Sequence, residues 1–61
     1  MYVIKMTTDY FGTSYHKGEG KDMNGNINTA LKYKDKSNAD IDCKGLQKFW
    51  DRYKVEVIEL K

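Results

Sequence analysis

The chain opens and closes on segments in which apolar and polar side chains alternate with the two-residue period of a β-strand. Residues 2–7 place Tyr2, Ile4 and Met6 on one face. Residues 54–60 carry apolar side chains on both faces, which is typical of a strand that is central in a sheet or is covered by a second molecule. We expect these two segments to pair with each other, because they are the most β-rich parts of the chain.

Two further strands are predicted between these ends. Residues 9–12 indicate a turn, in which Gly12 tolerates a positive φ without steric cost. A returning strand over 13–17 follows, with Tyr15 as its only strong packing side chain. A third strand is predicted over 29–34, where apolar side chains alternate with lysines.

The stretch between these two strands has the composition of a loop. Residues 18–28 combine glycine and asparagine with charged side chains, so we predict a flexible loop there. The pair Asn24-Gly25 is also a signal for a type I′ hairpin turn. The alternative is therefore a hairpin that extends the second strand toward the third.

A helical stripe is the clearest pattern in the chain. Its apolar members recur at spacings of four and three: Ala39, Cys43, Leu46, Trp50 and Tyr53. This pattern predicts an amphipathic helix with Phe49 at the margin of the stripe and Ile41 on the polar side. Residues 37–40 resemble a capping box at its start. Gly45 costs about 1 kcal/mol relative to Ala in a helix interior; it either lets the helix approach the sheet closely or marks a later start near Asp42.

These elements predict a single α+β domain over residues 1–61. The order is β-β-β-α-β, with a three- to four-stranded sheet and one helix packed on one face. A chain of this length buries only about 60% of the surface that its unfolded form exposes, so its core is small.

Composition narrows the chemistry. Cys43 is the only cysteine and His16 the only histidine, so the chain forms no intrachain disulfide and lacks the four ligands of a structural zinc site. A lone thiol favours a reducing compartment, and we expect a cytoplasmic protein without cofactors. The apolar stretch at the N-terminus ends at Lys5, too early for a signal peptide or a membrane span. The net charge of +2 does not favour nucleic acid as the partner.

Three segments of the chain carry a resemblance: residues 1–6 (MYVIKM), 27–34 (INTALKYK) and 55–60 (VEVIEL). Together with the capped helix, they resemble small uncharacterised proteins of phages and prophages of low-GC Gram-positive bacteria. The resemblance covers most of the chain and implies no activity. It does imply an accessory protein in the bacterial cytoplasm that binds and modulates a host or phage protein.

No group of residues predicts catalysis. Cys43 lies on the apolar stripe, where a free cysteine behaves as a small hydrophobe, so pairing it with His16 as nucleophile and base is disfavoured. Residues 22–33 fail as a calcium loop at both decisive positions, which Ile27 and Tyr33 occupy. Residues 18–21 lack the spacing of a P-loop and predict no nucleotide site. We expect a protein that is not an enzyme.

Binding is the remaining class of function. Aromatic side chains that are hard to bury predict a protein-binding surface at Tyr10, Phe11 and Phe49. The alternative is weak nucleic-acid binding by a basic face of Lys32, Lys34, Lys44, Lys48 and Arg52. A third class is a structural homo-oligomer. An open sheet edge would favour a homodimer with one continuous sheet.

Overall fold

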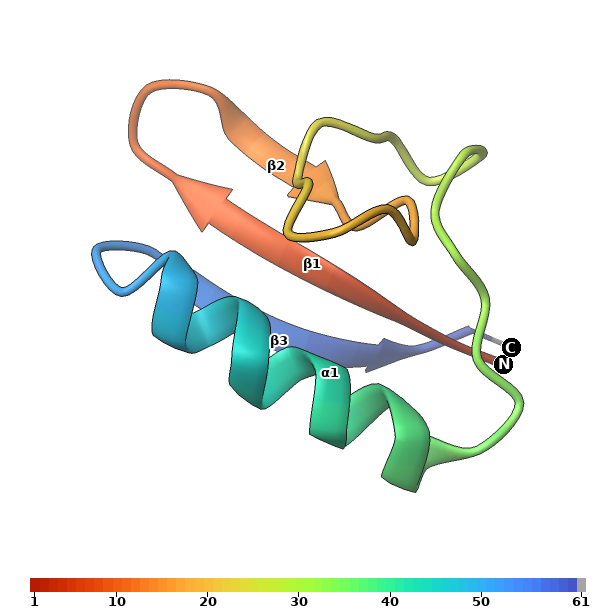
Figure 1. The fold of residues 1–61 in the computed structure, drawn as a ribbon. Coiled ribbons are helices and arrows are strands. Elements are labelled where there is room, and N and C mark those ends of the chain that lie inside the picture. The colour runs from red at the N-terminus through yellow and green to blue at the C-terminus, as the bar shows by residue number, and fades with distance from the viewer. Residues whose placement is uncertain (61) are drawn as a thin grey trace.

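Three strands form one antiparallel sheet, and a single helix lies across one of its faces (Figure 1). The structure is a computed structural model that describes residues 1–60. The elements are β1 (Tyr2–Thr8), β2 (Gly12–Tyr15), α1 (Lys36–Phe49) and β3 (Lys54–Glu59), and the strand order is β2-β1-β3. The predicted small α+β domain with one helix on a sheet is confirmed.

The central strand pairs with the last strand, as the sequence predicts. In the β1–β3 register Ile4 lies opposite Val57 and Met6 opposite Val55. Because alternate side chains share a face, these four point to the same side of the sheet, and they form the apolar core with Leu46 of α1. The core therefore lies between the sheet and the helix.

The helix follows its predicted stripe through Leu46, but it starts differently and ends at Phe49, so Tyr53 lies beyond it. Ala39 and Leu46 are buried, whereas Cys43 is half-buried against the core. The helix begins at Lys36 after the N-cap residue Asp35, whose side chain makes no capping hydrogen bond. The predicted capping box is therefore wrong, because Ser37 already lies inside the first turn and cannot cap it.

Both sequence-based interpretations of Gly45 are also wrong. The helix is continuous through this position, so Gly45 does not mark a later start. A Cβ on Gly45 would meet only the Lys21 ammonium, at 3.2 Å, and no atom of the sheet. The glycine therefore faces the loop that follows β2.

The predicted strand over 29–34 is absent from the described part of the chain. Its place is taken by one bridge between Tyr2 and Tyr33, whose backbone groups exchange two hydrogen bonds of 2.8 Å. Because β2 is short, the start of β1 has no partner strand on that side, and Tyr33 supplies one residue of pairing. The chain then turns away, because α1 begins at Lys36.

Gly25 forms a bridge and not a hairpin turn. Its φ is not positive, as a type I′ turn would require. Instead Gly25 exchanges backbone hydrogen bonds with Tyr15, the last residue of β2, at 2.9 and 3.0 Å. A Cβ at this position would lie 2.5 Å from Cγ of Lys17 and 2.9 Å from the Tyr15 carbonyl oxygen. Close approach, and not backbone freedom, is what requires glycine here.

Asp22 organises the long segment that joins β2 to α1. Its carboxylate accepts hydrogen bonds from the backbone N–H groups of Lys17 (2.8 Å) and Glu19 (3.3 Å), and it lies 3.0 Å from Nδ1 of His16. Partial burial opposes ionisation of Asp22, but these N–H groups and the neighbouring His16 lower the pKa of the carboxyl below its usual value. The segment thus has a polar framework, while its predicted flexibility stays a prediction.

Candidate binding surface

Five aromatic side chains gather at the end of the molecule that lies away from the two termini. They come from the β1–β2 turn and from the α1–β3 connection, which lie side by side at the left of Figure 1. We call this surface the aromatic end, and it comprises Tyr10, Phe11, Phe49, Trp50 and Tyr53. Two segments far apart in the sequence therefore build one surface.

All three predicted partner-binding residues lie at the aromatic end and face solvent. Tyr10 is 90% exposed, Phe11 83% and Phe49 60%. Tyr10 and Phe11 stand together, with ring centroids 6.4 Å apart. Leaving large apolar rings in water is unfavourable. Their exposure together on one surface therefore marks the aromatic end as a candidate interaction site.

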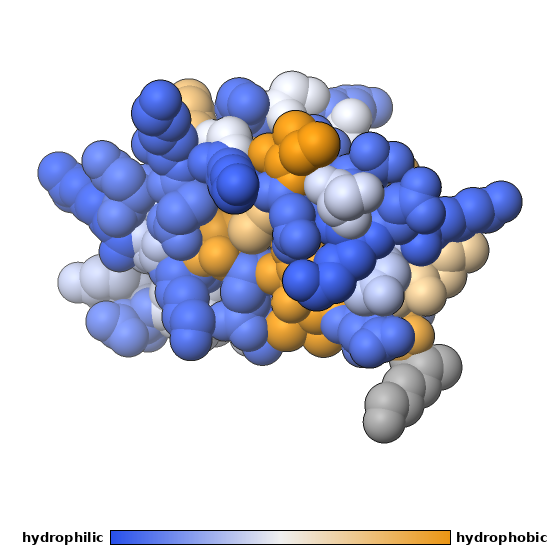
Figure 2. Space-filling view, turned by 90° about the horizontal axis from the view of Figure 1, so that it is seen from below, coloured by the Kyte–Doolittle hydropathy of each residue, from blue (hydrophilic) through white to orange (hydrophobic). Residues whose placement is uncertain are grey.

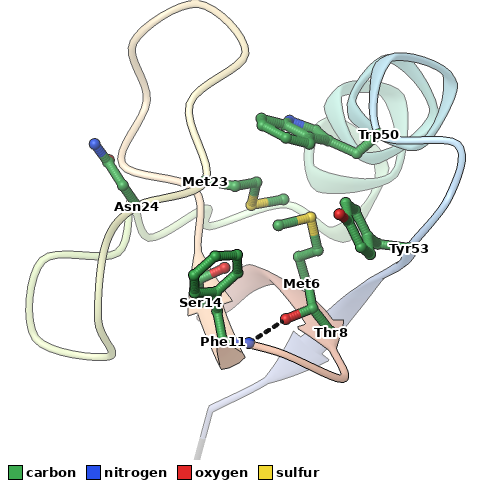
Figure 3. A pocket seen from close by; sticks show the side chains of 8 residues that line it. All are labelled: Met6, Thr8, Phe11, Ser14, Met23, Asn24, Trp50 and Tyr53. Atoms are coloured by element: carbon green, nitrogen blue, oxygen red, sulfur yellow. Dashed lines mark hydrogen bonds between the residues drawn. The ribbon is translucent and has the colours of Figure 1, made fainter.

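An apolar groove of about 350 Å³ opens between these aromatic side chains (Figure 3). Met6 and Met23, both nearly buried, form its floor. The rings of Phe11, Trp50 and Tyr53 stand around them. A groove with thioether sulfurs below and rings at its sides accepts apolar side chains of varied shape, because methionine adapts its conformation to what it contacts.

Trp50 links this groove to the core. Its indole N–H donates to the carbonyl oxygen of Lys21 at 2.8 Å, which ties the end of α1 to the segment after β2. The rings of Phe49 and Tyr53 lie at centroid distances of 5.2 and 6.4 Å from it. The sequence stripe places Trp50 and Tyr53 in the core, and the structure shows both half-buried against the core and lining the groove.

The turn that carries Phe11 is fixed by short-range geometry. Thr8, at the end of β1, accepts a hydrogen bond on Oγ1 from the backbone N–H of Phe11 at 2.8 Å. Gly12 follows with a φ of +70°, a conformation that side chains disfavour. The predicted turn at residues 9–12 is therefore confirmed, and it holds the Phe11 ring at the mouth of the groove (Figure 3).

Sequence reasoning missed the importance of Gln47. Its amide nitrogen donates to the carbonyl oxygens of Trp50 (3.1 Å) and Tyr53 (2.7 Å), and its amide oxygen accepts from the N–H of Val55 (2.9 Å). One side chain thus holds the connection that carries Trp50 and Tyr53 of the aromatic end. The sequence contains no signal for this role, because a glutamine beside an apolar stripe is common in helices.

The outer edge of β3 is partly closed. The backbone N–H of Leu60 donates to the Met1 carbonyl oxygen, so the backbone groups of Leu60 point toward β1. Because this direction alternates from one residue to the next along a strand, the backbone groups of Val55 point away from β1, toward the outer edge. Gln47 accepts from the Val55 N–H, and Cys43 donates from its thiol to the Val55 oxygen at 3.6 Å. Burial raises the pKa of this thiol, and two nearby carboxylates add to the effect. The expected open edge is therefore blocked at Val55.

The basic residues are spread along the molecule. Lys32 and Lys34 precede α1, Lys44 and Lys48 are exposed on it, and Arg52 follows it beside Tyr10. The view onto the helix shows a largely hydrophilic surface that a narrow hydrophobic patch interrupts (Figure 2). The predicted basic face therefore extends from one end of the helix to the other, and Arg52 belongs to the aromatic end.

His16 and Cys43, the two side chains that could suggest catalysis, contact different residues. Nδ1 of His16 contacts Asp22, and the thiol of Cys43 contacts Val55. Within residues 1–60 no three His, Cys, Asp or Glu side chains are grouped to hold a metal ion, and no helix is long and apolar enough to cross a membrane. Comparison of the chain with protein-family models, with curated proteins and with solved structures gives no match.

Proposed function

We propose that this chain is a non-enzymatic interaction module that binds a protein through the aromatic end. The observation that carries the proposal is the apolar groove with the exposed rings of Phe11 and Phe49 beside it. The resemblance to phage and prophage proteins supports a role as an accessory protein that modulates a host or phage protein in the bacterial cytoplasm.

The chemistry of the groove defines what the partner must offer. An apolar side chain of the partner would enter between the rings of Phe11 and Trp50 and contact Met23 below. Aromatic residues dominate binding energy at such sites, because they bury a large area while ordering few rotatable bonds. A neighbouring hollow is lined by Tyr10, Asp9, Arg52 and Lys54, and Lys54 already contacts Glu56 at 3.4 Å. Arg52 is therefore the group that favours an acidic residue next to the apolar anchor of the partner.

The sheet edges support the aromatic end as the binding surface. On the outer side of β2, Tyr15 is already paired with Gly25. On the outer side of β3, Gln47 and Cys43 occupy the backbone groups of Val55. Strand addition by a partner or by a second copy would have to displace these bonds, whereas the groove is already open.

Affinity capture from a bacterial lysate, with and without nuclease, tests the proposal when it is combined with a matched pair of variants. Phe11→Ala removes an exposed ring from the groove, and Ile41→Ala removes an apolar side chain that is 66% exposed on α1 outside the aromatic end. We expect the first to weaken binding of the captured protein by about tenfold or more and the second to leave it unchanged. Both should melt cooperatively near the wild-type temperature.

Three outcomes would contradict the proposal. Equal weakening by the two variants would place the interface elsewhere. Capture that disappears with nuclease would favour the alternative, nucleic-acid binding by Lys32, Lys34, Lys44, Lys48 and Arg52. A defined homo-oligomer in light scattering, whose assembly Phe11→Ala abolishes, would assign the aromatic end to self-association.

A further inference from the structure

A second hollow, also of about 350 Å³, lies between the segment after β2 and α1 and shares no lining residue with the aromatic groove. We call it the polar hollow. The lining residues that matter for its chemistry are His16, Lys21, Leu31, Ile41, Asp42 and Gly45. The proposed protein-binding function uses none of them.

His16 presents one unpaired nitrogen to this hollow. Its backbone N–H donates to the Ile4 carbonyl oxygen, so its side chain shares the face of Ile4, toward α1. The side chain is only 5% exposed, and Nδ1 lies 2.9 Å from the carbonyl oxygen and 3.0 Å from the carboxylate of Asp22. Both partners are acceptors, so Nδ1 carries a proton, and Nε2 is left without a partner.

The unpaired Nε2 is open to the hollow. It makes no hydrogen bond within residues 1–60. In that same part of the chain every fully enclosed side-chain nitrogen or oxygen has a hydrogen-bond partner. Nε2 of His16 is therefore not fully enclosed, and the open space that this residue lines is the polar hollow, where it can form a hydrogen bond with a ligand.

Lys21 supplies a positive charge to the polar hollow. Its ammonium lies 3.2 Å from the point that a Cβ on Gly45 would occupy, so the glycine makes room for it over the middle of α1. Lys21 forms no ion pair within residues 1–60. The one acidic group of the hollow, Asp42, accepts the hydroxyl of Tyr33 at 2.7 Å.

The ligand that fits must accept hydrogen bonds from Lys21 and form one with Nε2 of His16. A phosphate monoester does both near pH 6, because it carries negatively charged oxygens that accept beside one P–OH that donates. A volume of about 350 Å³ is near the lower limit for ligand sites, which indicates a small molecule. Leu31 and Ile41, both exposed, offer an apolar rim for its organic part.

We propose that the polar hollow binds a small phosphate monoester, with the phosphate between Lys21 and His16 and the organic group against Leu31 and Ile41. Gly18 and Gly20 line the same hollow, so the loop that carries them forms part of the proposed phosphate site although it lacks the sequence of a P-loop. Gly45, unfavourable for the helix, leaves space for the ammonium of Lys21.

Phenyl phosphate is a suitable probe, titrated at pH 6 into the ¹⁵N-labelled protein and followed by NMR. We expect saturable shifts of the backbone amides of Gly18, Gly20 and Gly45. Lys21→Gln should weaken binding by about tenfold, the loss of one charge-assisted hydrogen bond. The matched control is Lys17→Gln, which removes an exposed lysine of the same segment that does not line the hollow; it should change the affinity less than twofold.

Phenyl sulfate tests the choice of a phosphate, because it has the same shape but a single negative charge, weaker acceptor oxygens and no proton to donate. We expect it to bind about tenfold more weakly than phenyl phosphate. The proposal is overturned if phenyl phosphate causes no saturable shift, if the two lysine variants weaken binding equally, or if phenyl sulfate binds as tightly. Lys21 does not line the aromatic groove. The effect of Lys21→Gln on phosphate binding is therefore independent of the result of the protein-capture experiment.

Discussion

The two halves of this molecule are held together by different forces. The sheet and α1 meet through apolar side chains, with Ile4, Met6 and Leu46 at the centre. The segment between β2 and α1 buries Met23 and Ala30, but the hydrogen bonds that shape it centre on the carboxylate of Asp22. Packing therefore dominates in the first part, which we call the apolar half, and an ionised side chain organises the second, the polar half.

The difference matters because each half supplies one wall of each candidate site. Trp50 stands at the boundary, packed on the core and hydrogen-bonded to the Lys21 oxygen of the polar segment. The aromatic groove combines Met6 from the sheet with Met23 from that segment. Substitutions that act on one half alone therefore show how strongly the two halves depend on each other.

Trp50→Ala should have the largest effect, because it removes core packing and the bond between the halves together. We expect a loss of about 3 kcal/mol in the free energy of unfolding, the lower end for a tryptophan because this ring is half-buried. Urea unfolding followed by circular dichroism measures it. Phe49→Ala, which removes the exposed neighbouring ring, should cost well below about 1 kcal/mol. Equal losses would show that Phe49 belongs to the core.

Gln47→Ala should have the next largest effect, confined to the apolar half. It deletes three hydrogen bonds that hold the α1–β3 connection and leaves the Val55 N–H without its partner. We expect a loss of about 2 kcal/mol in the free energy of unfolding. Lys48→Ala, at the adjacent exposed position of α1, is the control and should be nearly neutral. A neutral Gln47→Ala would mean that water replaces the amide.

Asp22→Asn probes the polar half and should cost about 1 to 2 kcal/mol at neutral pH. Because the folded-state pKa of Asp22 is below the unfolded value, its contribution is full above the unfolded pKa, about 4. The contribution is lost as the pH falls through the folded pKa. Urea midpoints from pH 6 down to pH 2 should therefore converge for wild type and Asp22→Asn. Asp35→Asn, whose side chain makes no capping bond, should shift little. A constant gap between wild type and Asp22→Asn would contradict this role.

Gly45→Ala should have the smallest effect and the opposite sign. Alanine is favoured over glycine in a helix interior by about 1 kcal/mol, and the only atom in its way is the mobile end of Lys21. We expect a small rise in melting temperature. Gly20→Ala is the contrast, because a φ of +54° strains an alanine and should lower the melting temperature. A fall for Gly45→Ala would show that the Lys21 ammonium is held in place.

Local patterns predicted the apolar half of the fold in outline. Ile4 and Met6 of β1 and Ala39 and Leu46 of α1 are buried as their periods indicate, but Val3, on the other face of β1, is fully buried too. The pairing of β1 with β3 is confirmed as well. The exposure of Tyr10, Phe11 and Phe49 also followed from local reasoning, since neither a tight turn nor a stripe margin offers a place to bury a ring.

The polar half could not be predicted in the same way. The segment at 29–34 has the alternation of a strand, but it forms a single β-bridge at Tyr33 and one further backbone hydrogen bond from Leu31 to the His16 carbonyl oxygen. Asn24-Gly25 has the sequence of a hairpin turn, yet Gly25 serves a close backbone contact. The contacts of Asp22 with His16, and of Gln47 with Val55, join residues whose proximity only the folded chain creates.

The bonds that Gln47 and Cys43 make to Val55 also protect the edge of the sheet. Backbone groups on an uncovered edge strand can pair with a strand of another chain. In the native state the two helix side chains occupy the outward backbone groups of Val55. The helix therefore covers the core and, at the same time, removes one position at which a second molecule could extend the sheet.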